Sequence, residues 1–502
     1  MTHAFPDPRA APNVRYNPSR STLRSLAEAD ETTTEWGSPS YVSEYRSRSA
    51  DRTANANDDQ FAEADAAAVE DAQAALRETP LVCLDRRLGR HPDLSFTCRY
   101  YVPESYARIA LSWATLLEPA PEGAEPDFRT VQLPDWQETR IRVFPDAGVT
   151  YVLGSDYTGE AKKSFLRLFM YEAKRVGGLG LHAGAKRLYL EGADEPVGQL
   201  FLGLSATGKT TLTCHGFDLD DGERAELVQD DVCALLPDGA VAGSEGGGLY
   251  IKTDDLSPKT HPQLYRAATR PEAVLENVAV AADGTVDFAD DGLTSNGRAA
   301  VRRTDVPTAA DDIDLEAVHH VFFITRNPLM PPLARLSPPA AAAAFMLGES
   351  IQTSAGDPDA AGDPVRVVGT NPFIVGPPGE EGNRFLDLVA ANDIDCFLVN
   401  TGHVGDADPV DIGVDDTVAL LRAVARGTVT WRDDPALGLT VPADVPGLDL
   451  DRFYPPDRVA DYADRLGELR AERRRYLAQF DDLRPTVRET AMTAERPSAP
   501  TE

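Results

Sequence analysis

Residues 203–210 read Gly-Leu-Ser-Ala-Thr-Gly-Lys-Thr, a complete GxxxxGK[ST] phosphate-binding motif. In such a loop the glycines let consecutive backbone N–H groups point at phosphate oxygens. Lys209 adds a positive charge at the β- and γ-phosphates, and the Thr210 hydroxyl can reach a magnesium ion. The apolar run 197–202 (VGQLFL) predicts a buried strand before the motif, and residues 210–214 (TTLTC) predict the start of a helix after it. This order predicts a nucleotide site, and a glycine-rich turn without a ligand is the competing interpretation.

Lysine is rare in this chain, and acidic residues are abundant. Only seven of the 49 lysines and arginines are lysine, whereas 81 residues are aspartate or glutamate and the formal net charge is −32. A charge of this sign argues against nucleic acid or an anionic membrane as a partner. The carboxylates are spread along the chain between ordinary apolar segments. The composition therefore predicts a halophilic protein, adapted to very high salt, where surface charges are screened over a few ångströms.

Length and cysteine usage restrict the class of protein further. A chain of 502 residues can form two or three domains. No run approaches the ~18–20 apolar residues that span a bilayer, and the N-terminal segment lacks the apolar stretch of a secretory signal. Five cysteines without a CxxC pair argue against a disulfide framework or a zinc knuckle. We expect a cytoplasmic protein, and nothing in the sequence indicates an obligate protein partner.

The pattern of apolar and turn residues predicts an α/β fold with two lobes. We expect a mixed-sheet N-terminal domain at 26–178, which binds substrate, and a P-loop-containing C-terminal domain at 179–483, which binds nucleotide and metal. Residues 1–25 and 484–502 are expected to be disordered tails. Periodicity and turn residues predict strands within 97–153 and at 321–325 and 396–400, helices at 60–77, 164–176 and 457–480, and an Asp-Gly hairpin within 274–288.

Two successive lysines lie just before the predicted helix at 164–176, in the segment Tyr157-Thr-Gly-Glu-Ala-Lys162-Lys163. Adjacent ammonium groups repel each other, so the pair needs solvent, anionic ligands or a metal. A solvated surface pair is the usual interpretation. In a chain that otherwise uses arginine, a functional pair gains weight, because lysine can lose its proton and bind a metal whereas arginine cannot.

A histidine and two aspartates on either side of the phosphate loop complete the candidate set. His182 lies in an apolar run, where a lone histidine is more often a core residue than a ligand. Asp230 and Asp231 follow a predicted strand, 21 and 22 residues after Lys209. An acidic pair in this place is suited to hold Mg²⁺, directly or through water. A solvent-facing acidic pair is the alternative.

The order of these clusters resembles that of ATP-dependent phosphoenolpyruvate carboxykinase. Tyr-x-x-Glu-x-Lys-Lys comes first, a His follows 19 residues after the second Lys, and GLSxTGKTTL and Asp-Asp come next. Further segments look similar to the family, namely 252–253 (KT), 275–278 (LENV), 283–288 (DGTVDF), 296–298 (NGR), 331–336 (PPLARL), 400–402 (NTG) and the helix at 454–480. The resemblance covers about residues 150–480.

Enzymes of this family decarboxylate oxaloacetate and phosphorylate the resulting enolate with ATP, which yields phosphoenolpyruvate, CO2 and ADP in gluconeogenesis. The resemblance implies that Lys163, His182 and Asp231 hold Mn²⁺ at the enolate oxygen. It also implies that Lys162 adds positive charge between the enolate and the γ-phosphate. A second ion, Mg²⁺, is implied at the nucleotide, held by Thr210 and through its water shell by Asp230.

The resemblance also assigns contacts to substrate and nucleotide. Tyr157 would lie against the carboxylate that leaves as CO2, Lys163 would also bind substrate, and Arg298 would stabilise the transferring phosphoryl group. An arginine of the N-terminal domain is expected at the substrate carboxylate. Arg48 is the nearest match, with Arg46 as the alternative and an ordinary surface arginine as another. The implied nucleotide contacts are Gly203, Leu204, Ser205, Ala206, Thr207, Gly208, Lys209, Thr210, Thr211, Arg298 and Thr417.

Three positions depart from the family pattern. Ala206 stands where the cradle usually has glycine, and Glu245 is one residue away from the usual Glu-Gly-Gly spacing. Asp411 stands where the family has an arginine, six residues before the threonine at the nucleotide, here Thr417. With Asp411 in place of the arginine, the sequence does not decide which base the nucleotide carries. The phosphate-binding loop 203–210 lacks the cysteine that marks GTP-dependent relatives, which favours ATP.

The predicted function is ATP-dependent formation of phosphoenolpyruvate from oxaloacetate, with Mn²⁺ and Mg²⁺. A protein kinase of the HPr kinase type is one alternative, because it shares the cradle and the neighbouring carboxylates. It would not need His182 or the segment 157–163, which argues against it. A nucleotide-binding regulator without catalysis is the other alternative, motivated by Asp411 and by the faint N-terminal resemblance.

Overall fold

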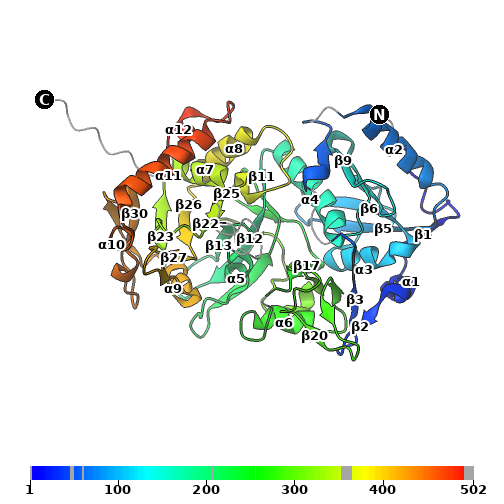
Figure 1. Cartoon of the computed structure of the whole chain (residues 1–502), viewed down its shortest axis with the longest axis horizontal. Coiled ribbons are helices and arrows are strands. Elements are labelled where there is room, and N and C mark those ends of the chain that lie inside the picture. Colours follow the sequence, from blue (N-terminus) through cyan, green and yellow to red (C-terminus); the bar gives the residue numbers. More distant parts are fainter. Residues whose placement is uncertain are drawn as a thin grey trace. The chain divides into compact units, whose positions relative to one another are not determined.

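The structure is a computed structural model that describes residues 3–45, 50–58, 61–204, 207–254, 256–351 and 364–490. Its chain divides into two compact units (Figure 1). Unit 1 comprises Met1–Glu172, Gly243–Ile313 and Phe373–Gly376, and unit 2 comprises Ala173–Ala242, Asp314–Pro372 and Pro377–Glu502. The chain first passes from unit 1 to unit 2 between Glu172 and Ala173, six residues before the boundary expected after residue 178. The sequence does not indicate the return of the chain to unit 1 at Gly243–Ile313, which places Arg298 in the same unit as Lys162 and Lys163.

Unit 1 is built on a mixed sheet whose strand order is β1-β5-β6-β8-β10-β9-β4, with β7 paired to β5. These strands are β1 (Val14–Tyr16), β4 (Thr53–Asn55), β5 (Leu81–Leu88), β6 (Phe96–Pro103), β7 (Glu118–Pro119), β8 (Phe128–Leu133), β9 (Arg140–Phe144) and β10 (Val149–Leu153). Strand β1 and part of helix α1 (Arg20–Leu26) lie in the segment expected to be a tail. Val14 pairs with Leu81 in parallel, so this segment extends the sheet.

A second sheet of unit 1 explains why the chain returns to it. Its order is β17-β21-β18-β3-β2, formed by β2 (Thr32–Thr33), β3 (Pro39–Tyr41), β17 (Gly248–Lys252), β18 (Val274–Glu276) and β21 (Arg298–Arg302). Leu275 of β18 pairs in parallel with Ser40 of β3, which joins the returning segment to the N-terminal one. The predicted Asp-Gly hairpin is confirmed as β19 (Ala279–Val280) and β20 (Val286–Asp287). The helices of unit 1 are α1, α2 (Glu63–Ala75), α3 (Ala107–Leu116), α6 (Pro262–Ala268) and most of α4 (Thr158–Arg175).

Unit 2 contains a mixed sheet of order β14-β12-β13-β22-β26-β23-β30-β29. Its strands are β12 (Ala183–Tyr189), β13 (Val197–Leu202), β14 (Arg224–Gln229), β22 (His320–Thr325), β23 (Leu333–Leu336), β26 (Asp395–Asn400), β29 (Thr430–Asp434) and β30 (Leu439–Asp444). The strands predicted at 197–202, 321–325 and 396–400 are confirmed, and they are parallel to one another. Their carboxyl ends therefore meet at one edge of the sheet, where ligands bind in many α/β proteins.

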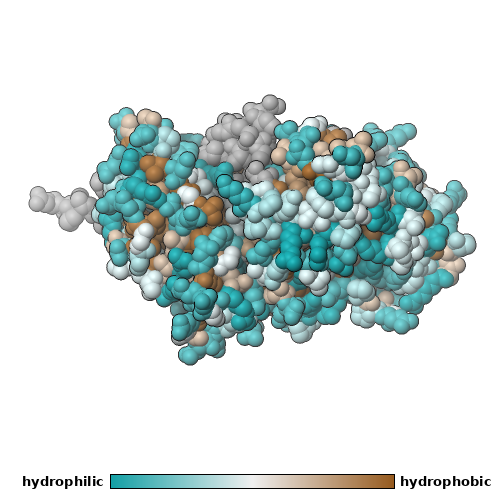
Figure 2. Space-filling view, turned by 90° about the horizontal axis from the view of Figure 1, so that it is seen from below, coloured by the Kyte–Doolittle hydropathy of each residue, from teal (hydrophilic) through white to brown (hydrophobic). Residues whose placement is uncertain are grey.

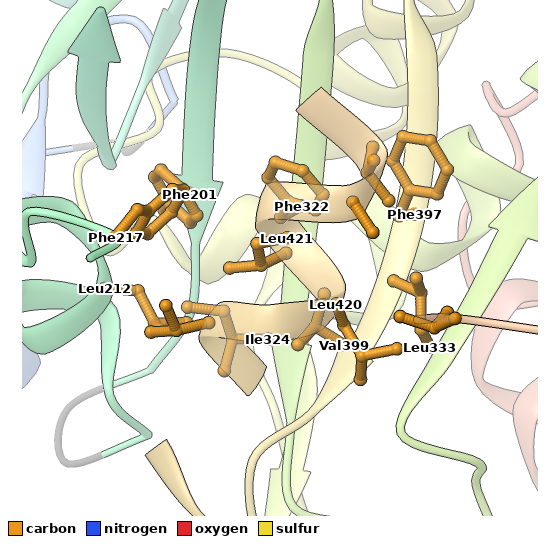
Figure 3. Close-up of a cluster of buried hydrophobic side chains, with 14 of the residues drawn as sticks. Phe201, Leu212, Phe217, Phe322, Ile324, Leu333, Phe397, Val399, Leu420 and Leu421 are labelled. Atoms are coloured by element: carbon orange, nitrogen blue, oxygen red, sulfur yellow. The ribbon is translucent and has the colours of Figure 1, made fainter. Parts of the chain in front are cut away.

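Aromatic side chains in register fill the core of unit 2. Phe201, Phe322 and Phe397 occupy equivalent positions on β13, β22 and β26. Their ring centroids lie 5.2 Å and 5.3 Å apart, and Leu420 and Leu421 of α9 (Val414–Ala425) pack against the same cluster (Figure 3). Other helices of unit 2 are α5 (Lys209–Cys214), α7 (Pro338–Leu347), α8 (Pro378–Ala391) and α11 (Tyr462–Leu477). The core fixes the sheet edge from which the phosphate loop extends.

Short elements complete unit 2. They are β11 (Leu179–Leu181), β15 (Cys233–Leu235), β16 (Val241–Gly243), β24 (Glu349–Ile351), β25 (Pro364–Arg366), β27 (His403–Val404), β28 (Val410–Asp411), α10 (Pro455–Arg458) and α12 (Pro485–Arg488). Helix α12 falls within the segment expected to be a C-terminal tail, and the residues after 490 lie outside the described part. In the described residues no helix is both long and apolar enough to cross a membrane.

Candidate active site

The lysine doublet lies inside helix α4, not before it as the sequence suggests. The helix begins at Thr158, earlier than the predicted 164, because its first N–H is held by a buried acceptor: Thr158 N donates to Glu276 Oε1 at 3.1 Å. A carboxylate at a helix N-terminus is favoured by the helix dipole. Lys162 and Lys163 therefore occupy the first two turns, with their backbone fixed by the helix.

Both lysines have defined partners in unit 1. Lys162 is 4% exposed and its Nζ lies 2.8 Å from Glu245 Oε2, so its ammonium group is buried in an ion pair. Lys163 Nζ lies 3.9 Å from Glu160 Oε1 and 5.2 Å from the centre of the Tyr157 ring. Neither lysine belongs to a solvated surface pair, which excludes that interpretation of the doublet.

Tyr250 connects the doublet to Arg298. Its ring centre lies 5.8 Å from Lys162 Nζ and 5.5 Å from the Arg298 guanidinium, so the same ring makes a cation–π contact with each of them. Its hydroxyl donates to Glu276 Oε2. Burial raises the pKa of Glu276, although the bond from Tyr250 and the charge of Arg108 oppose that rise. Sequence reasoning missed both residues: Glu276 lies in the family-like segment 275–278, whereas Tyr250 lies just before the segment 252–253 and outside it.

Asn296 holds two of the predicted residues. Its Nδ2 donates to the Tyr157 hydroxyl at 3.2 Å, and its Oδ1 accepts from Arg298 Nη2 at 2.8 Å. Tyr157 itself is 1% exposed. Unit 1 thus brings Tyr157, Lys162, Lys163 and Arg298 together through Tyr250 and Asn296.

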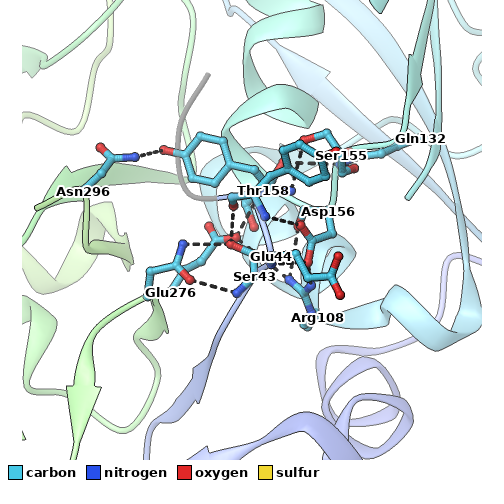
Figure 4. A network of polar contacts seen from close by, with 12 residues as sticks. Ser43, Glu44, Arg108, Gln132, Ser155, Asp156, Thr158, Glu276 and Asn296 are labelled. Carbon is cyan, nitrogen blue, oxygen red and sulfur yellow. Dashed lines mark hydrogen bonds and ion pairs between the residues drawn. The ribbon is translucent and has the colours of Figure 1, made fainter. Parts of the chain in front are cut away.

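A polar network fixes the chain that leads to the candidate substrate arginine (Figure 4). Arg108 Nη2 donates to Asp156 Oδ2, and the same carboxylate accepts from the backbone N–H groups of Glu44 and Tyr45 at 2.9 Å each. Asn277 Oδ1 accepts from Ser43 N at 2.8 Å. Arg46 and Arg48 lie outside the described residues, directly after this anchored segment.

In unit 2 the phosphate loop joins β13 to α5, as predicted. Gly208 precedes the helix with φ +101°, a conformation that favours glycine, and Lys209 and Thr210 form its first turn. Thr213 Oγ1 donates to Lys209 O at 2.7 Å. Of the predicted cradle, Gly203, Leu204, Thr207, Gly208, Lys209, Thr210 and Thr211 are described, and Ser205 and Ala206 are not.

His182 and Asp231 meet because β12 and β14 are antiparallel. His182 immediately precedes β12 and Asp231 follows β14, which brings His182 Nε2 to 3.0 Å from Asp231 Oδ1. Lys209 Nζ lies 3.1 Å from that Nε2 and 3.4 Å from that Oδ1. The three side chains therefore converge at Lys209, where the phosphate loop ends and α5 begins. Asp230, the residue before Asp231 in the chain, is 8% exposed.

The tautomer of His182 follows from its second nitrogen. Nδ1 lies 2.6 Å from the Thr370 carbonyl oxygen, which can only accept, so Nδ1 carries a proton. Burial, and then the charge of Lys209, lower the pKa of His182. A lower pKa favours the neutral imidazole, whose Nε2 can then accept a hydrogen bond from Lys209 Nζ at 3.1 Å. Two electron-pair donors aimed at one point are the arrangement that a divalent cation binds, and here the Lys209 ammonium group lies against both.

The donor set of unit 2 fits a cation with a nitrogen and an oxygen ligand. Among the described residues no group of three or more His, Cys, Asp and Glu side chains that could hold a metal is found. Imidazole and carboxylate are nevertheless ligand types that divalent transition metals accept, and hydroxyl and carboxylate oxygens, such as those of Thr210 and Asp230, are ligand types that Mg²⁺ prefers.

Two residues that the sequence does not reveal hold the phosphate loop and its helix. Thr401 Oγ1 donates to Thr207 O at 2.6 Å, from the end of β26. Lys186, which is 1% exposed, donates from Nζ to Leu212 O at 2.6 Å and to His215 O, at the other end of α5. Burial lowers the pKa of Lys186 well below its ordinary value. Lys186 is thus another lysine with a defined task in a lysine-poor chain.

Thr417 and Asp411 are found at the start of α9. Thr417 is 2% exposed and its Oγ1 donates to Gly413 O at 3.1 Å, within the first turn of the helix. Asp411 pairs with His403 in the hairpin of β27 and β28 and is exposed. The buried position of Thr417 and its local bond explain its place in the fold, and a nucleotide contact stays a prediction.

Comparison with known proteins identifies the family. The sequence profile of the phosphoenolpyruvate carboxykinase family matches residues 39–451. A phosphoenolpyruvate carboxykinase (ATP) of Aeropyrum pernix is 36% identical over 478 residues, which cover 93% of this chain and 94% of that protein. One of Azorhizobium caulinodans is 32% identical over 438 residues, 82% of this chain and 78% of that protein. In Salinibacter ruber, phosphoenolpyruvate carboxykinase (ATP) 1 is 32% identical over 353 residues, 66% of this chain and 63% of that protein. The chain therefore belongs to the ATP-dependent phosphoenolpyruvate carboxykinase family of carboxy-lyases.

Proposed function

We propose that this protein converts oxaloacetate and ATP to phosphoenolpyruvate, CO2 and ADP, as a step of gluconeogenesis. The observation that carries the proposal is the convergence of His182, Asp231 and Lys209 at the end of the phosphate loop. A phosphate-binding lysine beside a pair of cation ligands suits a reaction in which phosphoryl transfer follows the development of charge on a nearby oxygen.

Unit 2 supplies the groups that bind the nucleotide in this proposal. Lys209 and the N–H groups of the loop hold the β- and γ-phosphates, and the early turns of α5 direct further N–H groups at them. Thr210 and Asp230 are the proposed ligands of Mg²⁺, directly and through water. His182 and Asp231, with Lys163, are the proposed ligands of Mn²⁺. When bound, the divalent cation stabilises negative charge on the enolate oxygen.

Unit 1 supplies the groups that act on oxaloacetate. The C–C bond to the departing carboxylate breaks and its electron pair forms the enolate, whose oxygen then attacks the γ-phosphorus as the bond to the β-phosphate breaks. Lys162, whose ammonium group is held by Glu245, is proposed to balance the charge of the enolate and the γ-phosphate. Arg298 is proposed to stabilise the transferring phosphoryl group, and Tyr157 and Arg48 to contact the carboxylates. The reaction needs both sets of residues.

Product formation with two nucleotides tests this function. With oxaloacetate and Mn²⁺ in molar KCl, ³¹P NMR is expected to detect phosphoenolpyruvate with ATP, and formation with GTP is expected to be at least about tenfold slower. A Lys162→Met variant should lose about 10³-fold in kcat, whereas the exposed Lys259→Met variant should keep wild-type activity. Product with GTP alone would overturn the nucleotide assignment, and no product with either would leave a nucleotide-binding regulator as the function.

The surface supports the proposed adaptation to high salt. Figure 2 displays one face on which hydrophilic side chains predominate and apolar ones are scattered. Among the described residues the large apolar side chains that are well exposed are Val42, Tyr45, Val176 and Val414. With a net charge of −32, such a surface repels itself when salt does not screen it.

Melting in dilute buffer and in molar KCl tests this adaptation. We expect the melting temperature to be about 10 °C lower in dilute buffer, which corresponds to about 3 kcal/mol for units of this size. Circular dichroism at fixed pH measures it, with NaCl of equal ionic strength as the control for a specific effect of potassium. A melting temperature in dilute buffer that equals or exceeds the value in KCl would contradict the adaptation.

A further inference from the structure

Arg326 lies at the edge of the unit 2 sheet where the phosphate loop begins. It follows Thr325, the last residue of β22, and β22 is the parallel neighbour of β13, which leads into the loop at Gly203. Thr401 N donates to Thr325 O at 3.0 Å, and the Thr401 hydroxyl donates to Thr207 O, inside the loop, at 2.6 Å. One residue, Thr401, thus ties the backbone beside Arg326 to the phosphate loop.

The guanidinium of Arg326 has no hydrogen-bond or ion-pair partner among the residues that the structure describes. Its Nε is buried and unsatisfied, and the side chain lies against Gly402, where an added Cβ would come within 3.2 Å of the Arg326 Cβ. Burial lowers the pKa of Arg326. A buried donor without an acceptor destabilises a fold, so its presence in a native structure indicates a role other than stability.

Three other arginines of unit 2 have a carboxylate partner. Arg335, on β23, lies 2.5 Å from Asp395, and Arg366 and Arg473 both bind Glu349. The chain has 81 acidic residues available to neutralise an arginine. The Arg326 guanidinium is half-buried, lies beside a phosphate loop and has no carboxylate partner in the described part of the chain, so it is placed to receive an anion from outside the chain. Guanidinium groups match phosphate oxygens in geometry and charge.

We propose that Arg326 is a further nucleotide-binding residue, whose guanidinium donates to a phosphate oxygen of bound ATP. This inference rests on the proposed function. The sequence segment 203–211 contains one basic residue, Lys209, and Arg326 would add a second positive charge at the phosphates. Arg326 acts in binding, so its loss should affect the nucleotide and not oxaloacetate.

The inference predicts opposite effects of Arg326→Met on stability and on binding. Without nucleotide the variant should melt at the same temperature as the wild type or higher, because an unsatisfied buried donor is removed. Its Kd for Mg·ATP, measured by calorimetry in molar KCl, should rise by about tenfold to a hundredfold, and its KM for oxaloacetate should stay unchanged. The matched control is Arg335→Met, which breaks a surface ion pair and should leave the Kd unchanged. If Arg326→Met does not fold, Arg326→Gln is expected to give the same shift in Kd.

Inorganic tripolyphosphate separates a phosphate contact from a contact with the nucleoside. Its Kd should rise in Arg326→Met by the same factor as that of ATP. Weaker binding of ATP with unchanged binding of tripolyphosphate would overturn the phosphate assignment. A wild-type protein that binds ATP, with an Arg326→Met or Arg326→Gln variant of equal affinity, would overturn the role of Arg326 altogether. A wild-type protein that does not bind ATP would instead overturn the proposed function.

Discussion

Replacing Lys209 by methionine is expected to strengthen the binding of Mn²⁺ in the absence of nucleotide, although it strongly slows formation of phosphoenolpyruvate. The reason is that the Lys209 ammonium group lies 3.1 Å from His182 Nε2 and 3.4 Å from Asp231 Oδ1, the two proposed ligands. At that distance the ammonium group repels a divalent cation, and screening by salt weakens this repulsion without removing it. Methionine fills similar space without charge.

The expected gain in Mn²⁺ affinity is about tenfold, which corresponds to about 1.4 kcal/mol. Titration of Mn²⁺ with protein, followed through the EPR signal of the free ion in molar KCl, measures it without any catalytic step. Phosphoenolpyruvate formation should fall by about 10²- to 10³-fold, because the β- and γ-phosphates lose their main charge. The two readouts therefore move in opposite directions.

Three variants of matched chemistry complete this test. Lys209→Arg keeps the positive charge and should keep the weak Mn²⁺ binding of the wild type. Lys259→Met removes an exposed lysine and should leave both readouts unchanged. His182→Ala, combined with Lys209→Met, should lose the gained affinity, since it removes one ligand. Mn²⁺ affinity in Lys209→Met that equals or falls below that of the wild type would contradict the placement of the cation at His182 and Asp231.

The part of the site that could be predicted from sequence is the part that depends on spacing along the chain. The phosphate loop needs glycines, a lysine and a threonine at fixed offsets between a strand and a helix, and the structure has β13 and α5 in those places. Asp231 was predictable because a strand precedes it. The sequence signal for His182 as a ligand was weak on its own. The antiparallel pairing of β12 with β14 brings this side chain next to Asp231.

The remaining parts depend on contacts between residues far apart in sequence. Helix α4 begins at Thr158 because Glu276, 118 residues later, accepts from its N–H, and no local signal encodes that acceptor. The same contact converts a lysine doublet expected before a helix into one inside it. The return of the chain to unit 1 could not be predicted for a similar reason, since it depends on the pairing of β18 with β3 of the N-terminal segment. Arg326 looks in sequence like any other arginine, and its distinguishing feature is a half-buried guanidinium without a partner in the described part of the chain.

Replacing Arg473 by methionine is expected to lower the free energy of unfolding of unit 2 by about 3–5 kcal/mol. Arg473, on α11, is 1% exposed and binds Glu349 with two nitrogens, Nε to Oε2 at 3.1 Å and Nη2 to Oε1 at 2.5 Å. Arg366 adds a second guanidinium at 3.1 Å. In the variant the buried Glu349 carboxylate keeps Arg366 but loses Arg473. The loss of stability exceeds the net contribution of the ion pair, because a buried charge is left without one of its two partners.

Urea unfolding in molar KCl measures this loss within unit 2. Of the four tryptophans only Trp431 belongs to that unit, so 5-fluorotryptophan labelling gives one ¹⁹F resonance that reports on it, assigned through Trp431→Phe. The double variant Glu349→Gln with Arg473→Met removes both charges and should recover most of the stability. A double variant as unstable as Arg473→Met alone would assign the effect to packing of the arginine side chain instead.

The same carboxylate gives unit 2 a defined response to acid. Burial alone would raise the pKa of Glu349, but the guanidinium groups of Arg473 and then Arg366 hold it at about 2, below the ordinary 4.5. Because the folded state favours the deprotonated form, this stabilisation is complete above pH 4.5 and is lost as the pH falls from 4.5 toward 2. The difference in free energy of unfolding between the wild type and Glu349→Gln should therefore be constant above about pH 5.5 and shrink by about 2 kcal/mol by about pH 3. A difference that stays constant over that interval would mean that Glu349 titrates alike in both states and that its two arginines do not stabilise its charge.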